Sequence, residues 1–292
     1  MIVITTPSGD IGGRVLARVL EAGIDVRIVA RHPAKVPSDI RDRTEIVEGS
    51  HADGAVIRRA MDGASAVFWL PPGDPTALDA HAAYVGFSRA FIESLPGSSV
   101  SHVVGVSAVG RGWPKPAGLV TASLAMDDLI GATGVSYRAL CCASLMDNVL
   151  RQVGPIRSEG VFYAPTPRDL PLPHVAKEDV AEVGTGLLLD LEWNGVEEVP
   201  LLGPDDISHN AMAAIMSEVL GKPVRYQEMS MDQFEVTMAS LGASKGMARD
   251  YAEMMIAKNE GMDTSSPAGN RKNSPTTFHK WAENQLRTGI SQ

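Results

Sequence analysis

The chain has very little cysteine: of its 292 residues only Cys141 and Cys142 are cysteines, and they are adjacent. Adjacent cysteines cannot build a disulfide framework, and no further cysteine stands at the spacing that a zinc site needs. Apolar runs are also short, since none approaches the ~18 residues that a membrane-spanning helix requires. These absences exclude a disulfide-stapled secreted domain and a cysteine-based zinc module, and they predict a protein without a membrane span.

Positive charge is scarce as well. The chain has 26 Lys and Arg against 35 Asp and Glu, which gives a net charge of −9 and a pI near 5.3. Direct binding to nucleic acid depends on clustered Lys and Arg, and no run of like charge suggests a tail or a membrane patch. The chain opens directly on the apolar run MIVIT, without a charged leader. We therefore expect a cytoplasmic protein that binds neither nucleic acid nor membrane.

What the sequence does contain is a regular alternation of short β-rich runs and helical patterns. The β-rich runs stand at 2–5, 25–30, 44–49, 66–70, 102–107 and 136–141, with helical candidates at 53–62, 76–95 and 118–133. Such alternation is typical of βαβ units in a parallel sheet that is covered on both faces. Right-handed crossovers leave few topologies. The prediction is an α/β fold with a doubly wound parallel sheet, the Rossmann type.

The pattern changes near residue 150. Residues 154–175 carry five prolines and predict an irregular loop over the carboxyl edge of the sheet. Beyond about residue 205 the sequence is mostly helical. Ser208 is placed to cap one helix, and Ser230 with Gln233 forms a capping box for the next.

Two domains are therefore expected. Residues 1–153 form the cofactor-binding domain, and residues 154–292 form a smaller, mostly helical subdomain that shapes the substrate pocket. Parts of 176–205 are expected to return to the sheet.

A glycine-rich turn follows the first predicted strand, in the stretch ITTPSGDIGG at residues 4–13. In a dinucleotide site the first glycine makes a tight turn, the second lets the backbone approach the diphosphate, and the third lets helix pack on strand. Thr6 stands in the first place, and Gly9 and Gly12 stand in the other two. Because Thr6 is β-branched and precedes Pro7, we expect it to be extended with negative φ, with the turn rebuilt one residue later.

The hydroxyls of this turn would then be available to phosphate oxygens, and the first amides of the following helix would face the anion. The residues expected to hold the cofactor here are Thr6, Ser8, Gly9, Asp10, Ile11 and Gly12. The alternative is a strand-to-helix turn without a ligand. We favour the cofactor site, because the motif follows a strand and opens a helix.

Arg31 ends the second strand, about 20 residues beyond the glycines, where an NAD-preferring site carries an acidic residue for the ribose. An arginine there can pair bidentately with a 2′-phosphate. The alternative is a solvated surface arginine. Taken with the glycines, Arg31 favours NADP(H) over NAD(H).

Several stretches carry a family resemblance. In order, these are TTPSGDIGGRV, IVARHPAKV, DGASAVFWLPP, SHVVGVSAVG, DDLIGATGVSYRAL and LMDNVL, then HVAKEDVAEVGTGLLLD and LLGPDDISHNAMAAIMSEVLGKPVRY. The chain resembles the NmrA-like branch of atypical short-chain dehydrogenases/reductases up to about residue 226. The resemblance implies NADP(H) held also by Leu70, Pro71 and Pro72, with Ser107 near the nicotinamide. The family spans NADPH-dependent reductases and redox-sensing regulators, so either activity is open.

The chain departs from the family in its acid–base groups. No Tyr-x-x-x-Lys occurs, and Ser123 stands where many reductases of the family carry a lysine. Reduction of an ordinary ketone benefits from a positioned acid. A quinone or another conjugated acceptor needs less help, since its product anion is already stabilised. The departure thus favours such acceptors, or no turnover.

Three residues are candidates for the missing proton donor: Ser107, His174 and Asp147. The ordinary pKa of histidine suits this work at neutral pH, although a lone loop histidine is more often structural. Asp147 could instead cap the helix that follows it, and the Ser107 hydroxyl could be satisfied by backbone. Residues expected to line the substrate pocket are Trp113, Met146, Asn148, Tyr163 and His174.

Three functions remain open from the sequence. The first is an NADPH-dependent oxidoreductase that reduces a small conjugated, aromatic or quinone-like molecule. The second is an NADP(H)-binding sensor without turnover that acts on a protein partner. The third is a non-redox isomerase or cyclase on the same fold. A homodimer or a protein partner is possible in each case.

Overall fold

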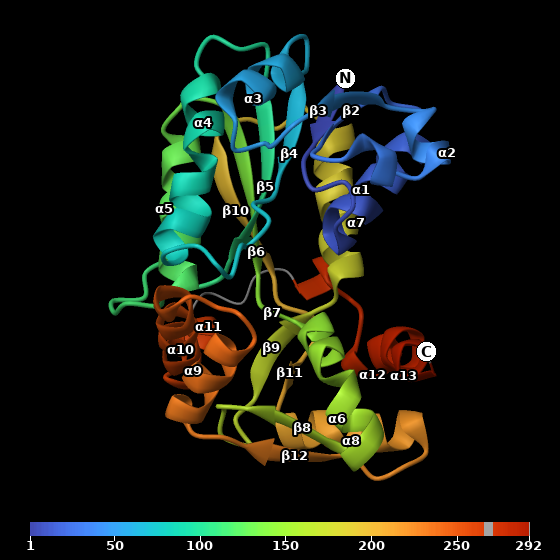
Figure 1. Cartoon of the computed structure of the whole chain (residues 1–292), viewed down its shortest axis with the longest axis vertical. Coiled ribbons are helices and arrows are strands. Elements are labelled where there is room, and N and C mark those ends of the chain that lie inside the picture. Colours follow the sequence, from blue (N-terminus) through green and yellow to red (C-terminus); the bar gives the residue numbers. More distant parts are fainter. Residues whose placement is uncertain (266–270, 292) are drawn as a thin grey trace.

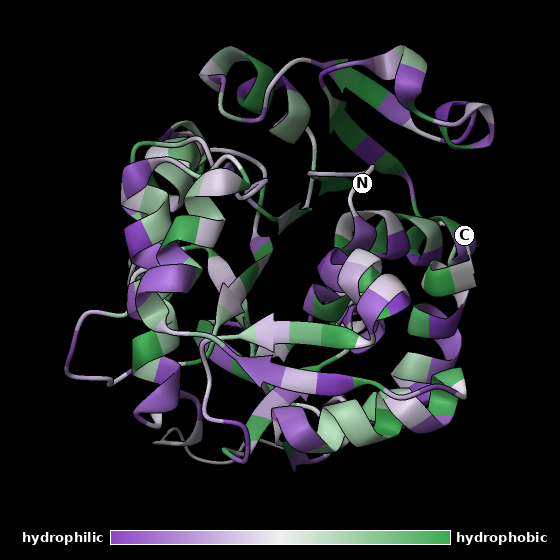
Figure 2. Cartoon of the chain, turned by 60° about the horizontal axis from the view of Figure 1, so that its bottom comes forward, coloured by the Kyte–Doolittle hydropathy of each residue, from purple (hydrophilic) through white to green (hydrophobic). Residues whose placement is uncertain are grey.

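The computed structural model describes residues 1–265 and 271–291. Figure 1 shows two parts, a sheet with helices on both faces above and a mixed C-terminal part below. Coloured by hydropathy, the helices carry both hydrophilic and hydrophobic residues, as expected for helices that turn one face to a core (Figure 2). Within the described residues, no helix is both long and apolar enough to cross a membrane.

The main sheet has seven strands, and every neighbouring pair is parallel. In spatial order they are β10 (Val196–Leu201), β6 (Ser136–Cys142), β5 (His102–Ala108), β4 (Ala66–Trp69), β1 (Ile2–Ile4), β2 (Val26–Ala30) and β3 (Glu45–Glu48). Strands β1, β2 and β4 are buried along their whole length, as expected for a parallel sheet covered on both faces. The predicted doubly wound fold is confirmed.

Helices cover each face of this sheet over a separate hydrophobic core. One face carries α1 (Asp10–Glu21) and α7 (Lys177–Leu189), which pack on each other. The opposite face carries α3 (Gly54–Met61), η2 with α4 (Ala82–Gly86 and Phe87–Ser94) and α5 (Leu119–Gly131). The smaller helices η1 (Pro33–Lys35) and α2 (Ser38–Arg41) follow β2.

The segment 154–175 is more regular than the sequence suggested. It contains most of α6 (Val153–Glu159), β8 (Val161–Ala164) and β9 (Leu172–Val175), so the prediction of one irregular loop was wrong. Long-range pairing overrides the prolines, because β8 pairs with β12 (Arg225–Glu228) and β9 with β11 (Asp206–Ile207). The second neighbour of β9 is β7 (Ser144–Leu145), which precedes the 3₁₀ helix η3 (Met146–Gln152).

The rest of the C-terminal part is mostly helical. Its elements are α8 (His209–Leu220), α9 (Met231–Ser240), α10 (Lys245–Asn259), α11 (Met262–Ser265), η4 (Arg271–Asn273), α12 (Phe278–Trp281), η5 (Ala282–Leu286) and α13 (Arg287–Ser291). Ser208 caps α8, and Ser230 with Gln233 forms the capping box of α9. Both predicted caps are confirmed.

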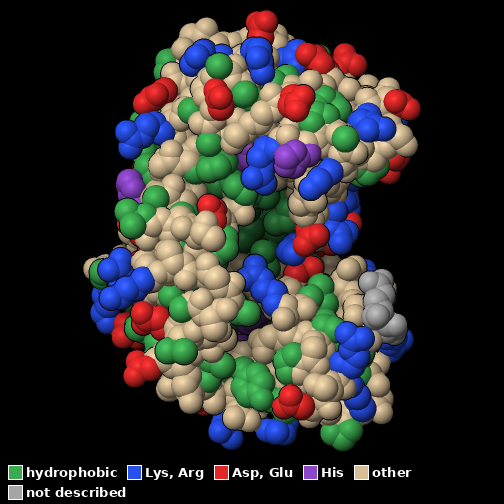
Figure 3. Space-filling model, in the orientation of Figure 1, with side chains coloured by type: hydrophobic (Ala, Val, Ile, Leu, Met, Phe, Trp, Pro, Cys, Tyr) green, Lys and Arg blue, Asp and Glu red, His purple; other side chains and the backbone are tan. Residues whose placement is uncertain are grey.

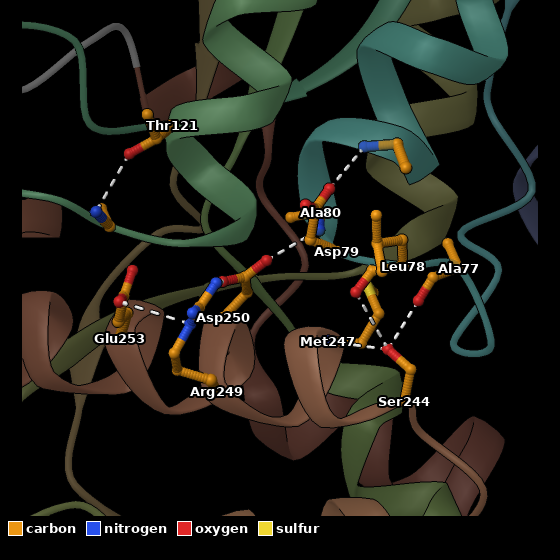
Figure 4. Close-up of polar contacts among 12 residues, drawn as sticks. Ala77, Leu78, Asp79, Ala80, Thr121, Ser244, Met247, Arg249, Asp250 and Glu253 are labelled. Carbon is orange, nitrogen blue, oxygen red and sulfur yellow. Dashed lines mark hydrogen bonds and ion pairs between the residues drawn. The ribbon is translucent and has the colours of Figure 1, made fainter.

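The helix α10 is attached to the loop after β4 (Figure 4). Ser244 Oγ donates to the carbonyl of Ala77 at 2.5 Å, and the amide of Ala80 donates to Asp250 Oδ2 at 2.7 Å. A Cβ at Gly246 would overlap the carbonyl oxygen of Leu78. These contacts join α10 to the segment that follows β4 at the carboxyl edge of the sheet.

Candidate active site

A hollow crosses the middle of the molecule between the sheet and the C-terminal part (Figure 3). Hydrophobic side chains form its floor, and Lys and Arg side chains lie at its rim together with His and acidic side chains. The carboxyl ends of the sheet strands meet here, where open α/β sheets bind ligands.

The glycine-rich turn lies at the carboxyl end of β1. Thr6 has a φ of 51°, in the left-handed region, so the expected negative φ was wrong. Contacts on both sides impose this conformation. Thr5 Oγ1 donates to Phe68 O and accepts from the amide of Leu70, and a Cβ at Gly12 would overlap the carbonyl oxygen of Thr6. Thr6 therefore makes the tight turn that a glycine would otherwise make, and the backbone strain resides at this residue.

The predicted β-turn is nevertheless present, since the amide of Gly9 donates to Thr6 O at 3.0 Å with Pro7 in the second position. Gly9 is the N-cap residue of α1, and no side chain caps the helix. The first amides of α1 thus have no partner from the helix or from a cap. Thr6 Oγ1 is buried and also lacks a hydrogen-bond partner. A free hydroxyl beside uncapped amides suits the diphosphate of a dinucleotide.

The negative charge of Asp10, in the first turn of α1, is compensated by a distant lysine. Lys177 Nζ lies 2.5 Å from Asp10 Oδ2, and this contact lowers the pKa of Asp10. Lys177 begins α7, which packs against α1 and so brings this lysine to the turn. The sequence did not assign Lys177 to the site, because nothing in the local pattern links it to Asp10.

Arg31 is exposed at the carboxyl end of β2, and among the described residues no hydrogen bond or ion pair to its guanidinium is present. Arg31 is close enough to Asp74 and His51 to shift the pKa values of both side chains. Hydrogen bonds from Thr76, and to a lesser degree the charge of Arg31, lower the pKa of Asp74. Burial, with help from Arg31, lowers the pKa of His51 to about 4. An available guanidinium at this strand end suits a phosphate group.

The loop after β4 carries the other three residues expected to hold the cofactor. Leu70 is half-buried, Pro71 is buried and Pro72 is exposed. The hydrogen bond from the Leu70 amide to Thr5 Oγ1, at 3.0 Å, fixes this loop beside the glycine-rich turn.

Ser107 lies near the carboxyl end of β5 with its side chain toward α5. It is 6% exposed, and its hydroxyl donates to Asp127 Oδ2. The alternative of a hydroxyl satisfied by backbone is therefore wrong; the partner is a buried carboxylate on the neighbouring helix.

The environment of Asp147 differs from the one that the sequence predicted. The Asp147 side chain makes no cap, because η3 begins with Leu145 as its N-cap and no side-chain hydrogen bond, so the capping interpretation was wrong. Its carboxylate is buried, with Oδ1 3.9 Å from Lys177 Nζ and Oδ2 unpartnered. Met146 is packed in the C-terminal hydrophobic core, whereas Asn148 is exposed.

His174 is not in an irregular loop but in strand β9, where it is 5% exposed. Burial lowers its pKa to about 4, and its Nδ1 is 2.9 Å from the carbonyl of Leu172. Its imidazole is therefore neutral at pH 7. The structure thus contradicts the expectation that His174 supplies a proton from an accessible loop.

The two aromatic pocket candidates belong to different elements of the fold. Trp113 packs beside Ala117, Val120 and Met262, and its Nε1 is buried without a partner. Tyr163 belongs to β8, at the end of the C-terminal part remote from the main sheet in Figure 1. No group of three or more His, Cys, Asp or Glu side chains in residues 1–265 and 271–291 is placed to hold a metal ion.

The fold and this site define a Rossmann-type NAD(P)-binding protein. The chain belongs to the NAD(P)H-binding family whose model matches residues 8–190. Its resemblance to NmrA-like atypical short-chain dehydrogenases/reductases is thereby confirmed.

Two relatives illustrate the sequence likeness. The (4-alkanoyl-5-oxo-2,5-dihydrofuran-3-yl)methyl phosphate reductase of Streptomyces griseus is 30% identical, over 80% of this chain and 78% of that protein. An NAD(P)H azoreductase of Xenophilus azovorans is 22% identical, over 87% of this chain and 86% of that protein.

Solved structures share the fold. The NADPH-dependent quinone oxidoreductase of Escherichia coli in complex with NADPH superposes with a TM-score of 0.81 at 19% identity, covering 98% of this chain and 99% of that one. The triphenylmethane reductase of Citrobacter sp. in complex with NADP(H) gives a TM-score of 0.74 at 17% identity, covering 100% and 99%.

Proposed function

We propose that this protein is an NADPH-dependent reductase of a small conjugated, aromatic or quinone-like acceptor. The observation that carries the proposal is the glycine-rich turn, in which Thr6 Oγ1 and the first amides of α1 are free while Arg31 is available at the end of the next strand. Together they provide partners for a diphosphate and for a 2′-phosphate.

In this proposal the chain's own residues bind and orient the cofactor. Thr6, Ser8 and the first amides of α1 hold the diphosphate. Lys177 removes the repulsion that Asp10 would exert on it, and Arg31 selects the phosphorylated ribose. When bound, NADPH supplies the hydride. Ser107 is proposed to lie near the reacting atoms, since it stands at the end of a central strand.

The acceptor class follows from what the site lacks. The sequence has no Tyr-x-x-x-Lys pair, and His174 is buried and neutral. The usual Tyr-x-x-x-Lys acid is thus missing, which disfavours ordinary ketones and favours acceptors whose product anion is delocalised. The names of several relatives support the same class, as they describe reductases of azo, quinone and triphenylmethane compounds.

The proposal also places the protein in the cytoplasm. Cys141 and Cys142 are buried free thiols, and a reducing compartment with an NADPH pool suits both the thiols and the reaction. Cell fractionation with an antibody against the chain tests the location.

The test of function begins with calorimetric titration of the purified protein with NADPH and then NADH. Tighter binding of NADPH is expected. NADPH oxidation is then followed with menadione, an azo dye and malachite green, and at least one should be reduced. Binding of NADPH without oxidation across this panel would favour the sensor. Absence of binding to either nucleotide would overturn the proposal.

A further inference from the structure

A buried hydrogen-bonded cluster extends from Ser107 into the protein. Ser107 Oγ donates to Asp127 Oδ2, and Tyr137 Oη donates to Asp127 Oδ1 at 2.5 Å. Ser123 Oγ lies 3.4 Å from Ser107 Oγ. The four residues are at most 6% exposed. A carboxylate with two hydroxyl partners inside a parallel α/β layer requires an explanation, because burying a charge is costly.

The backbone of β5 is adapted to this cluster. A Cβ at Gly105 would overlap the hydroxyl of Tyr137, so only glycine lets the tyrosine reach Asp127. Gly105 and Ser107 point to the same face of β5, since side chains alternate along a strand. Strand β5 therefore admits Tyr137 at one position and presents Ser107 at the other.

Asp127 also contacts a second space. It lines a pocket of about 300 Å³ at the outer edge of the sheet, between α5 and the strands β6 and β10. This is room for several water molecules. Arg111 borders the pocket and donates to Glu198 and to Asp128, the latter at 2.9 Å. Asp127 is thus located between the pocket and Ser107.

The surroundings of Asp127 favour a proton on it. Burial raises its pKa to about 6, while the hydrogen bonds from Ser107 and Tyr137 act in the opposite direction. From the pocket, Arg111 lowers the pKa and Glu198 of β10 raises it. From β6, the thiol of Cys141 is itself neutral, because burial raises its pKa. Tyr137 cannot be the acid, since burial and Asp127 raise its pKa well above the ordinary value.

We infer that Asp127 is a positioning residue and proton reservoir for reduction, delivering a proton through Ser107 Oγ from the edge pocket to the acceptor. The inference rests on the proposed function. It assigns a role to the pocket and to Asp127, and it provides a proton source in a chain that has no Tyr-x-x-x-Lys.

The acceptor gains a hydride, which brings two electrons, and becomes an anion. The anion takes the hydroxyl proton of Ser107, and Ser107 Oγ takes the carboxyl proton of Asp127. The Asp127 carboxylate is then reprotonated by water from the edge pocket. In sum NADPH is oxidised to NADP⁺ and the acceptor gains one hydride and one proton.

The test compares Asp127→Asn with the matched variant Asp128→Asn. Both remove one carboxylate from adjacent positions of α5, but the Asp128 side chain is 64% exposed and pairs only with Arg111 among the ion pairs of the described residues. Asparagine keeps the size of the side chain but cannot carry the proton. Steady-state oxidation of NADPH with menadione is measured from pH 5 to pH 9.

The wild-type kcat is expected to fall as pH rises above about 6. In Asp127→Asn, kcat at pH 6 should be about 10–100-fold lower and nearly independent of pH, with KM for NADPH within about twofold of wild type. Asp128→Asn should follow the wild-type profile. A wild-type pH profile in Asp127→Asn would overturn the inference while leaving the proposed function intact. Absence of any acceptor reduction by the wild type, across all three acceptors, would overturn both.

A second measurement needs no cofactor. Infrared difference spectra recorded on either side of pH 6 should show the carbonyl band of a protonated carboxyl group in wild type, in Asp128→Asn and in Ser107→Ala, but not in Asp127→Asn. Ser107→Ala should keep this band and lose the pH dependence of kcat. If Asp127→Asn does not fold, Ser107→Ala still tests the inference. A wild-type pH profile of kcat in Ser107→Ala would overturn proton transfer from Asp127 through Ser107 Oγ.

Discussion

Lys177 Nζ lies 2.5 Å from Asp10 Oδ2 and 3.9 Å from Asp147 Oδ1, so one ammonium group connects the start of α7, the start of α1 and the segment after β6. Its side chain is only 18% exposed. The positive charge therefore lies at the edge of the glycine-rich turn, where two carboxylates would otherwise repel a diphosphate.

Lys177→Met should weaken NADPH binding about tenfold, because Asp10 would then face the diphosphate without compensation. Lys177→Arg should retain most of the affinity. Isothermal titration calorimetry measures both. Lys115→Met is the control, since it also removes a lysine from an ion pair, here the exposed pair with Glu260. Equal affinity in Lys177→Met and Lys115→Met would contradict this role.

Arg31→Ala should reduce NADPH affinity by about 10–100-fold and leave NADH affinity unchanged, because only NADPH carries the 2′-phosphate. The ratio of the two dissociation constants is the readout. Arg89→Ala, at an exposed position of α4, should change neither constant. An unchanged ratio in Arg31→Ala would eliminate Arg31 as the phosphate partner.

Gly12→Ala should destabilise the protein by about 1–3 kcal/mol, because the added methyl group overlaps the carbonyl oxygen of Thr6 and forces the turn to move. Gly186→Ala, at an exposed position of α7 with no atom near the added Cβ, should instead stabilise by up to about 1 kcal/mol. Urea unfolding gives both free energies. The same sign for both substitutions would contradict the close contact at Gly12.

Thr6→Gly should stabilise the chain by roughly 0.5–1 kcal/mol, because relief of the strain at a φ of 51°, about 1–3 kcal/mol, exceeds the roughly 0.5–1 kcal/mol entropic cost of a glycine. Thermal unfolding of the protein without nucleotide tests this. The same variant loses the free hydroxyl and should bind NADPH more weakly. A lower melting temperature would indicate that Thr6 contacts outweigh its backbone strain.

The lowered pKa of His174 predicts that the free energy of unfolding depends on pH. Its folded pKa is about 4, below the ordinary 6.5, so its neutral form is favoured by folding and the related stability is present above pH 6.5. That stability is lost as pH falls from 6.5 toward 4, by roughly 3 kcal/mol at about 1.4 kcal/mol per pKa unit. Chemical unfolding at pH 7 and pH 4.5 should show a smaller pH effect in His174→Gln than in wild type.

His279→Gln is the control, because the His279 side chain is 41% exposed. It should keep the wild-type pH dependence of stability. His174→Gln should also retain NADPH oxidation, provided it folds, since a buried neutral imidazole is not the proton donor. A complete loss of turnover in a folded His174→Gln protein would contradict that conclusion.

Much of the sheet could be predicted because its signals are local. Strands such as Val26–Ala30 and Ala66–Trp69 are short apolar runs, and the caps at Ser208 and Ser230 depend on residues three positions away. Local sequence signals did not predict the secondary structure correctly where long-range contacts determine it. The proline-rich segment 154–175 forms strands because β11 and β12 provide partners for it. His174 is consequently buried in a strand rather than exposed in a loop.

The sequence alone determined the alternating strands and helices, the position of the glycine-rich turn and the absence of a Tyr-x-x-x-Lys pair, because each is a matter of residue type and short spacing. Tertiary structure alone decided which charges meet. Lys177 and Asp10 are 167 residues apart, and Ser107 and Asp127 are 20 residues apart on different elements. Contacts of this kind form only when the strands pair and the helices pack. The sequence around one partner does not indicate which residue the other will be.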